Sequence, residues 1–220
     1  MNEEANLRSR SPLPTFHQYR GFLDESECET LLDWAVSNCE RFRPSTVFGG
    51  VLDAQERSSE RLPDLGPMET VFQRRLRELF PDILARTGTR SFEVDVIELE
   101  LVAHGDGAHF ARHIDIPVGP GRLPLGGDGS GQDRLLSAVH YFHDEPKSFS
   151  GGALRLHRYG SEGLPGDFVD IEPENNSLLV FPSWALHEVR QIRCPSGAFR
   201  NYRFAVNAWF CKVLALGRDE

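Results

Sequence analysis

The spacing of hydrophobic residues changes partway along the chain, and the N-terminal part has the pattern of helices. Two stretches repeat apolar residues every three or four positions, which is the spacing of one helix face. The first stretch, residues 22–42, places on one face Cys28, Leu31, Leu32, Ala35, Cys39 and Phe42. The second begins near Pro67 and places on one face Met68, Val71, Phe72, Leu76 and Leu79.

Two local signals mark the ends of these helices. Asp24 is followed three residues later by Glu27, which predicts a capping box, and Leu23 and Cys28 are placed as a hydrophobic staple. Pro81 predicts a break or a kink in the second helix, because proline has no backbone N–H to donate.

After Thr87 the pattern becomes one of strands. Apolar and polar residues alternate, β-branched and aromatic residues are frequent, and Gly, Pro, Asn and Asp separate the segments. Six segments read in this way: 91–103, 134–143, 151–157, 167–173, 176–182 and 202–210. Many short strands separated by turns indicate a β-sandwich or a jelly roll.

The order of the elements, with helices first and strands after them, predicts one α+β domain with a mainly β core. We expect a disordered tail over residues 1–12 and a single domain over 13–220, divided into a helical part (13–88) and a β core (89–212). The glycine-rich stretch 116–133 is either a lid over a site or a plain surface loop.

Composition removes several classes of protein. The net charge of −9 and the lack of a Lys/Arg cluster argue against nucleic acid as a main partner. Four cysteines without a C-x-x-C pair predict buried free thiols. The N-terminus is polar, and no run approaches the roughly 18 apolar residues of a membrane span. We expect a cytoplasmic protein without a membrane partner, and no pattern indicates its oligomeric state.

The stretch GAHFARHIDIP places a histidine and an aspartate two residues apart, His113 and Asp115. In an extended segment these two side chains point to the same side. The pair has three interpretations: a surface accident, half of a catalytic acid/base pair, or two ligands of a metal. An isolated H-x-D is common by chance, so the choice depends on further residues.

A third ligand is offered by His187, which follows the apolar segment SLLVFP. Two histidines and one carboxylate form the facial triad that suits ferrous iron and leaves coordination positions open, whereas zinc prefers a tetrahedral site. His109 and His113 have the spacing of a helical zinc pair, but the glutamate of H-E-x-x-H is absent and glycines precede them.

Arg203 adds a second kind of signal. On a strand it shares one face with Ala205, Asn207 and Trp209. If this face is buried, the guanidinium needs an anion, and the strand carries no acidic residue. A ligand carboxylate held by the planar guanidinium would satisfy it. A metal triad and a buried arginine together suit a dicarboxylate with the shape of 2-oxoglutarate.

With these residues in place, the chain resembles the iron(II)/2-oxoglutarate-dependent dioxygenases of the prolyl 4-hydroxylase type. The resemblance covers residues 93–210 and is greatest to the branch of the oxygen-sensing prolyl hydroxylases and their bacterial relatives. It rests on the order H-x-D, a later His, and an Arg 16 residues beyond it. The segments HGDGAHFARHIDIP, LLSAVHYFH, SGGALRL, FVDIEP and LLVFPSWALHEVRQI carry it as well.

The resemblance implies a double-stranded β-helix, a cupin-like jelly roll with the N-terminal helices packed outside. It implies that the iron ligands are His113, Asp115 and His187, and that Arg203 pairs with the distal carboxylate of 2-oxoglutarate, with Trp209 six positions on.

Two further residues are candidates for the same carboxylate. Tyr141 matches a position where some relatives place a tyrosine hydroxyl on it, although a core aromatic with a satisfied hydroxyl is the alternative. Asn207 shares the face of Arg203 and is a possible donor.

The chain departs from the family pattern at two places. Relatives often carry a tyrosine near the start of the AHGDG turn, where this chain has Ala103 and His104. Phe110 replaces a tyrosine common three residues before the first iron histidine, so a hydroxyl is missing from that wall. Substrate choice is therefore expected to differ from that of the peptide-modifying relatives.

The function implied is hydroxylation of an unactivated C–H bond, in a prolyl residue of a peptide or protein or in a proline-like small molecule. Fe(II) is the cofactor, 2-oxoglutarate and O2 are cosubstrates, succinate and CO2 are released, and ascorbate is a candidate reductant. The alternative is a non-catalytic sensor that binds 2-oxoglutarate or another carboxylate in the same pocket.

Overall fold

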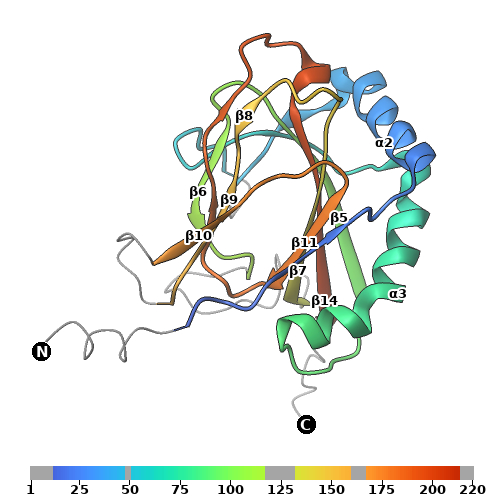
Figure 1. Cartoon of the computed structure of the whole chain (residues 1–220), viewed down its shortest axis with the longest axis vertical. Helices are drawn as coiled ribbons and strands as arrows, with labels where there is room; N and C mark the ends of the chain where they lie inside the picture. Colours follow the sequence, from blue (N-terminus) through green and yellow to red (C-terminus); the bar gives the residue numbers. More distant parts are fainter. Residues whose placement is uncertain (1–11, 48–50, 117–131, 160–166, 214–220) are drawn as a thin grey trace, which may run out of the picture.

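The computed structural model describes residues 12–47, 51–116, 132–159 and 167–213. Two β-sheets dominate it, and two α-helices lie on one side of the strands (Figure 1). Residues 1–11 of the expected tail (1–12) and residues 117–131 of the glycine-rich stretch (116–133) lie outside the described residues.

The larger sheet has seven strands, and all of its pairings are antiparallel. Its spatial order is β1 (His17–Arg20), β11 (Ser177–Pro182), β7 (Gln132–Phe142), β14 (Arg203–Val213), β5 (Val96–His104), β4 (Glu60–Leu62) and β2 (Arg43–Pro44). β1, near the start of the described chain, thus lies beside β11, from its last third, because the two strands pair (Figure 1).

The smaller sheet has five strands. Its order is β10 (Phe168–Ile171), β9 (Leu154–His157), β12 (His187–Val189), β6 (His109–His113) and β3 (Arg57–Ser58). A short pair, β13 (Ile192–Arg193) with β8 (Ser150–Gly151), completes the strands of the described chain. The predicted jelly roll is confirmed, and the segment 13–88, expected to be helical, also contributes β1 to β4.

The α-helices are α2 (Glu25–Ser37) and α3 (Glu69–Thr87), and short 3-10 turns lie at Cys39–Arg41, Gly66–Met68 and Phe199–Asn201. The capping box at α2 is confirmed: Asp24 Oδ1 accepts from the Glu27 backbone N–H, and Glu27 Oε2 accepts from that of Asp24, both at 2.9 Å. Neither α2 nor α3 combines the length and the apolar composition needed to cross a membrane.

Pro81 does not end α3, which continues to Thr87. Instead, the helix bends partway along its length (Figure 1), as a missing N–H donor and the proline ring require. Phe72 and Leu76 before the proline and Ile83 after it are all buried, so packing holds the two parts of the helix against the sheet.

Alternation along the strands creates two separate cores. One core fills the space between the helices and the outer face of the larger sheet, and it includes Leu31, Phe72, Leu101, Leu136, Phe204, Val206 and Phe210. The other lies inside the jelly roll and includes Val139, Tyr141, Leu154, Leu156, Leu179, Phe181 and Ala205. All four cysteines are free, and two of them, Cys194 and Cys211, are buried.

His140 lies in the outer core, on the opposite face of β7 from Tyr141. The rings of Phe22 and Phe72 have centroids 5.3 Å and 5.4 Å from its own. Its Nε2 lies 3.3 Å from Asn176 Oδ1, which already accepts a hydrogen bond from the backbone of Leu23. Burial lowers the pKa of His140 to about 4, so this packing requires a neutral imidazole.

We expect the stability conferred by neutral His140 to be lost as the pH falls from about 6.5 to about 4. In this window the unfolded chain binds a proton that the folded chain excludes, and the free energy of unfolding drops by about 3 kcal/mol. Urea unfolding across this range, compared with His140→Leu, isolates the effect from other histidines. Parallel loss of stability in the two proteins would contradict the prediction.

Candidate metal centre

A cavity of about 1290 Å³ opens between the two sheets. Side chains of β5, β6 and β14 line it, together with the start of β12. Five of the six predicted site residues are in its lining, namely His113, Asp115, His187, Arg203 and Asn207, and the sixth, Tyr141, is fully buried in the inner core.

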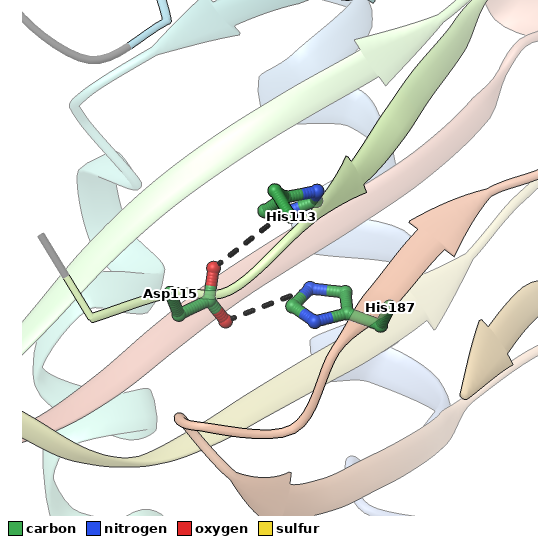
Figure 2. Close-up of side chains that lie close together, drawn as sticks. All are labelled: His113, Asp115 and His187. Atoms are coloured by element: carbon green, nitrogen blue, oxygen red, sulfur yellow. Dashed lines mark ion pairs between the residues drawn. The ribbon is translucent and has the colours of Figure 1, made fainter. Parts of the chain in front are cut away.

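His113, Asp115 and His187 converge in this cavity (Figure 2). The two histidines are direct cross-strand partners of β6 and β12, which places their side chains on the same face. Asp115 lies two residues beyond His113, and its backbone N–H donates to the Ser183 carbonyl at 3.0 Å. One ligand atom from each residue lies within 4.8 Å of the others.

Backbone carbonyls orient both imidazole rings. His113 Nδ1 lies 2.7 Å from the Ala111 carbonyl oxygen, and His187 Nδ1 lies 2.8 Å from that of Ala185. A carbonyl only accepts, so each Nδ1 carries a proton, and in a neutral ring Nε2 then presents a lone pair. These Nε2 atoms lie 3.7 Å and 3.8 Å from the oxygens of Asp115, too far for hydrogen bonds (Figure 2).

Ser137 holds the carboxylate of Asp115 and is itself bonded to Ser183, and the sequence analysis predicted neither serine. Ser137 Oγ donates to Asp115 Oδ2 at 2.6 Å and lies 2.9 Å from Ser183 Oγ. Because the hydroxyl hydrogen of Ser137 is used by Asp115, Ser183 donates to Ser137. The inward position of Ser137 on β7 was the one signal in the sequence for a role of this serine in the cavity. Its other partner, Ser183, is 46 residues away along the chain, so local spacing could not join the two.

The protonation states suit a cation. Burial and the neighbouring His187 lower the pKa of His113 to about 3. Burial alone would raise the pKa of Asp115, but His187, His113 and the hydrogen bond from Ser137 together lower it. At neutral pH the group therefore offers an imidazole lone pair and an ionised carboxylate, the state that metal binding requires.

This donor set fits a divalent transition metal. Two imidazole nitrogens and one carboxylate oxygen are the ligands of non-haem ferrous sites, and three protein ligands leave coordination positions open toward the cavity. The carbonyls behind the imidazoles and the serine behind the carboxylate are the outer contacts that orient metal ligands. Ferrous iron is thus compatible with the residues present.

Phe110, three residues before His113, covers one face of its imidazole ring. The two rings stack with centroids 3.5 Å apart and an interplanar angle of 17°. The guanidinium of Arg57 lies 4.8 Å from the centre of the Phe110 ring and pairs with Glu100 at 3.2 Å. The wall beside His113 is therefore apolar, and a salt bridge holds its outer layer in place.

Arg203 is 1% exposed, and no carboxylate of the described chain pairs with it. Its guanidinium lies 4.8 Å from the centre of the Tyr141 ring, and Nη1 lies 3.1 Å from His104 Nδ1. Its Nε and the Tyr141 hydroxyl are buried without a hydrogen bond of normal geometry to any described residue, and the nearby guanidinium acts to lower the pKa of Tyr141, which burial raises to about 12. Tyr141 thus lies beside the guanidinium of Arg203, and both interpretations of its hydroxyl stay predictions.

Gly152 provides the room that Arg203 needs. A Cβ at this position would lie 2.7 Å from Arg203 Cδ, and the backbone has a φ of +75°, which side chains rarely tolerate. The SGGALRL segment thus carries a glycine for a steric reason that becomes visible only when β14 is placed beside it.

The remaining residues of the arginine face differ in their surroundings. Asn207 is partly exposed and lines the cavity, and no hydrogen bond joins its side chain to another described residue. Trp209 is buried under the guanidinium of Arg134, 3.9 Å from the centre of its ring, and Arg134 in turn donates to Glu98 at 2.9 Å.

Solved structures with the same fold include prolyl hydroxylases. A prolyl-4-hydroxylase of Pseudomonas putida aligns with a TM-score of 0.63 and 20% identity, covering 94% of this chain and 96% of that one. A Trichoplax adhaerens prolyl hydroxylase, in complex with a hypoxia inducible factor oxygen degradation domain peptide fragment, aligns with a TM-score of 0.64 and 20% identity, covering 94% and 86%.

Sequence comparison identifies the family. An uncharacterized PKHD-type hydroxylase of Synechocystis is 31% identical over 207 residues, which cover 91% of this chain and 64% of that relative's length. Residues 99–211 match the family model of the 2OG-Fe(II) oxygenase superfamily, and this region contains the metal candidates and Arg203. The chain belongs to the 2OG-Fe(II) oxygenase superfamily.

Proposed function

We propose that this protein is an Fe(II)- and 2-oxoglutarate-dependent hydroxylase of the prolyl 4-hydroxylase type. The observation that carries the proposal is the pairing of two features in one cavity: a His–Asp–His cluster able to hold a metal, and a buried guanidinium without a carboxylate partner. A single dicarboxylate with a 2-oxo group satisfies both.

In this proposal His113, Asp115 and His187 hold the iron, and Arg203 and Tyr141 receive the distal carboxylate of 2-oxoglutarate, with Asn207 as a further donor. When bound, Fe(II) supplies the centre at which O2 oxidises 2-oxoglutarate to succinate and CO2, one oxygen atom entering succinate and the other the C–H bond of the substrate.

The chain itself orients the metal ligands and excludes water from the reacting centre. The cross-strand pair of histidines and the backbone carbonyls behind them fix the directions of the metal-facing lone pairs. The ring of Phe110 and the buried inner core keep water from the reacting centre, which suppresses side reactions of a strong oxidant.

A prolyl residue in a peptide or protein is the substrate we favour, with a proline-like small molecule as the other form of the same chemistry. Support comes from the Synechocystis relative, named a PKHD-type hydroxylase, and from the Trichoplax adhaerens enzyme, whose structure contains a peptide. Ascorbate as the reductant and a cytoplasmic location belong to the same proposal.

Asp115→Ala should abolish metal binding and turnover, because the carboxylate is the only anionic ligand of the cluster. We expect the affinity for Mn(II), measured by titration, to fall by more than about 100-fold, the upper range for losing a contact behind a ligand. Succinate formation should disappear while circular dichroism stays unchanged. Asp170→Ala, which removes a carboxylate bonded to Arg155, is the matched control. Normal turnover in Asp115→Ala would refute the assignment of the cluster as the metal site.

Ser137→Ala should weaken metal binding without removing it. The hydroxyl holds Asp115 Oδ2 at 2.6 Å, and loss of such a contact typically costs about 10-fold in metal affinity. The same Mn(II) titration measures the effect. Ser45→Ala removes a buried hydroxyl bonded to Ser59 and should leave the affinity unchanged. Equal affinities for both variants would show that the serine does not support the ligand.

Arg203→Met should separate cosubstrate binding from folding. The ligand-free variant should unfold at the same or a higher urea concentration than the wild type, because a buried charge without an anionic partner is removed. In the wild type with Mn(II), 2-oxoglutarate at 100 times its Kd should add about 2.7 kcal/mol to the free energy of unfolding. The variant should gain nothing at that concentration. Stabilisation equal to that of the wild type would contradict a carboxylate at Arg203.

A further inference from the structure

His104 and Arg203 face each other at one end of the larger sheet. His104 is the last residue of β5, Arg203 is the first of β14, and the two are direct partners in the antiparallel register. Side chains of such partners lie on the same face. Both residues line the cavity, and both are less than a tenth exposed.

The contact between them defines the tautomer of His104. Arg203 Nη1 lies 3.1 Å from His104 Nδ1, and a guanidinium only donates. Nδ1 therefore carries no proton, and in a neutral ring the proton is on Nε2. Burial, followed by the charges of Arg203 and Arg57, lowers the pKa of His104 well below its usual value, which agrees with a neutral ring.

His104 lines the cavity, and its ring contacts both the guanidinium and the backbone of Arg203; no hydrogen bond of the ring to another described side chain is found. The guanidinium of Arg203 lies next to His104 and 4.8 Å from the centre of the Tyr141 ring, and neither Arg203 Nε nor the Tyr141 hydroxyl has a hydrogen bond of normal geometry within the described part of the chain. These three side chains present N–H and O–H groups, and no carboxylate accepts from them. A carboxylate, with two oxygens and about four lone-pair directions, complements such a set.

We propose that His104 is a positioning residue for the cosubstrate: its Nδ1 holds Arg203 in place, and its Nε2–H donates to the distal carboxylate of 2-oxoglutarate. The inference rests on the proposed function and extends it to a position at which the chain departs from its relatives. Acting as acceptor toward the arginine and donor toward the ligand, the imidazole turns the guanidinium toward the ligand without adding charge to the buried end of the cavity.

Two substitutions test this role. His104→Phe keeps an aromatic ring and removes both hydrogen bonds. His104→Gln keeps an acceptor for Arg203 and a donor for the ligand. Binding of 2-oxoglutarate to the Fe(II)-loaded proteins is followed without oxygen, by the visible absorbance that 2-oxo acids give when they chelate Fe(II). 2-Oxopentanoate, which has a methyl group in place of the distal carboxylate, is the matched control ligand.

We expect His104→Phe to raise the Kd of 2-oxoglutarate by about 10- to 100-fold, as for the loss of one or two hydrogen bonds to charged groups. His104→Gln should stay within about 3-fold of the wild type. The Kd of 2-oxopentanoate and the affinity for Mn(II) should be the same in all three proteins, because neither reports on the distal carboxylate.

Three outcomes would overturn the inference. Equal binding of 2-oxoglutarate by the wild type and His104→Phe would remove His104 from the site and leave the proposed function intact. An equal loss for 2-oxopentanoate would assign the residue to folding of the cavity instead. Absence of 2-oxoglutarate binding by the wild type would reject the proposed function, and this inference with it.

Discussion

The long antiparallel pairing of β14 with β5 on one side and β7 on the other is the constraint on which the site depends. It runs over nearly the whole strand, so the register of three segments is fixed together. Because side chains alternate, a slip of one residue would turn Arg203 into the outer core and Phe204 into the cavity. The pairing places Arg203 opposite His104, and Ala205 beside Tyr141.

The same alternation lets one sheet serve two purposes. The outward residues of β14, including Phe204, Val206 and Phe210, pack against the helices in a core without charged members. The inward residues face a cavity that contains a guanidinium, imidazoles and a carboxylate. Burial of apolar surface on the outer face is worth about 25 cal/mol per Å², and this offsets the cost of polar groups held without partners inside.

Those unpartnered groups are the reason for regarding the cavity as a binding site. The Tyr141 hydroxyl and the Arg203 Nε are buried without hydrogen bonds of normal geometry to described residues, whereas most buried polar groups in folded proteins have a partner. At the other end, the lone pairs of two imidazoles point toward one carboxylate across gaps of 3.7 Å and 3.8 Å. In the proposed function, a single ligand bound to the metal and to Arg203 would satisfy both ends.

The sequence by itself determined the local features of this protein. The capping box of Asp24, the helical face around Leu31 and the alternation along residues 202–210 depend on neighbours a few positions away, so composition and spacing are enough to predict them. The H-x-D pair belongs to this class only in part, because β6 ends at His113 and Asp115 lies in the bend that follows the strand. The resemblance to a family added the order in which His187 and Arg203 follow.

Only the tertiary structure decided which residues meet. Ser137 and Ser183 are 46 residues apart, and His104 and Arg203 are 99 apart, so no local pattern joins them. The inclusion of β1 to β4 in the sheets and the clearance of Arg203 over Gly152 have the same origin. Alternation says which face a side chain occupies, but the register across strands, set by packing of the whole chain, says which side chain lies opposite it.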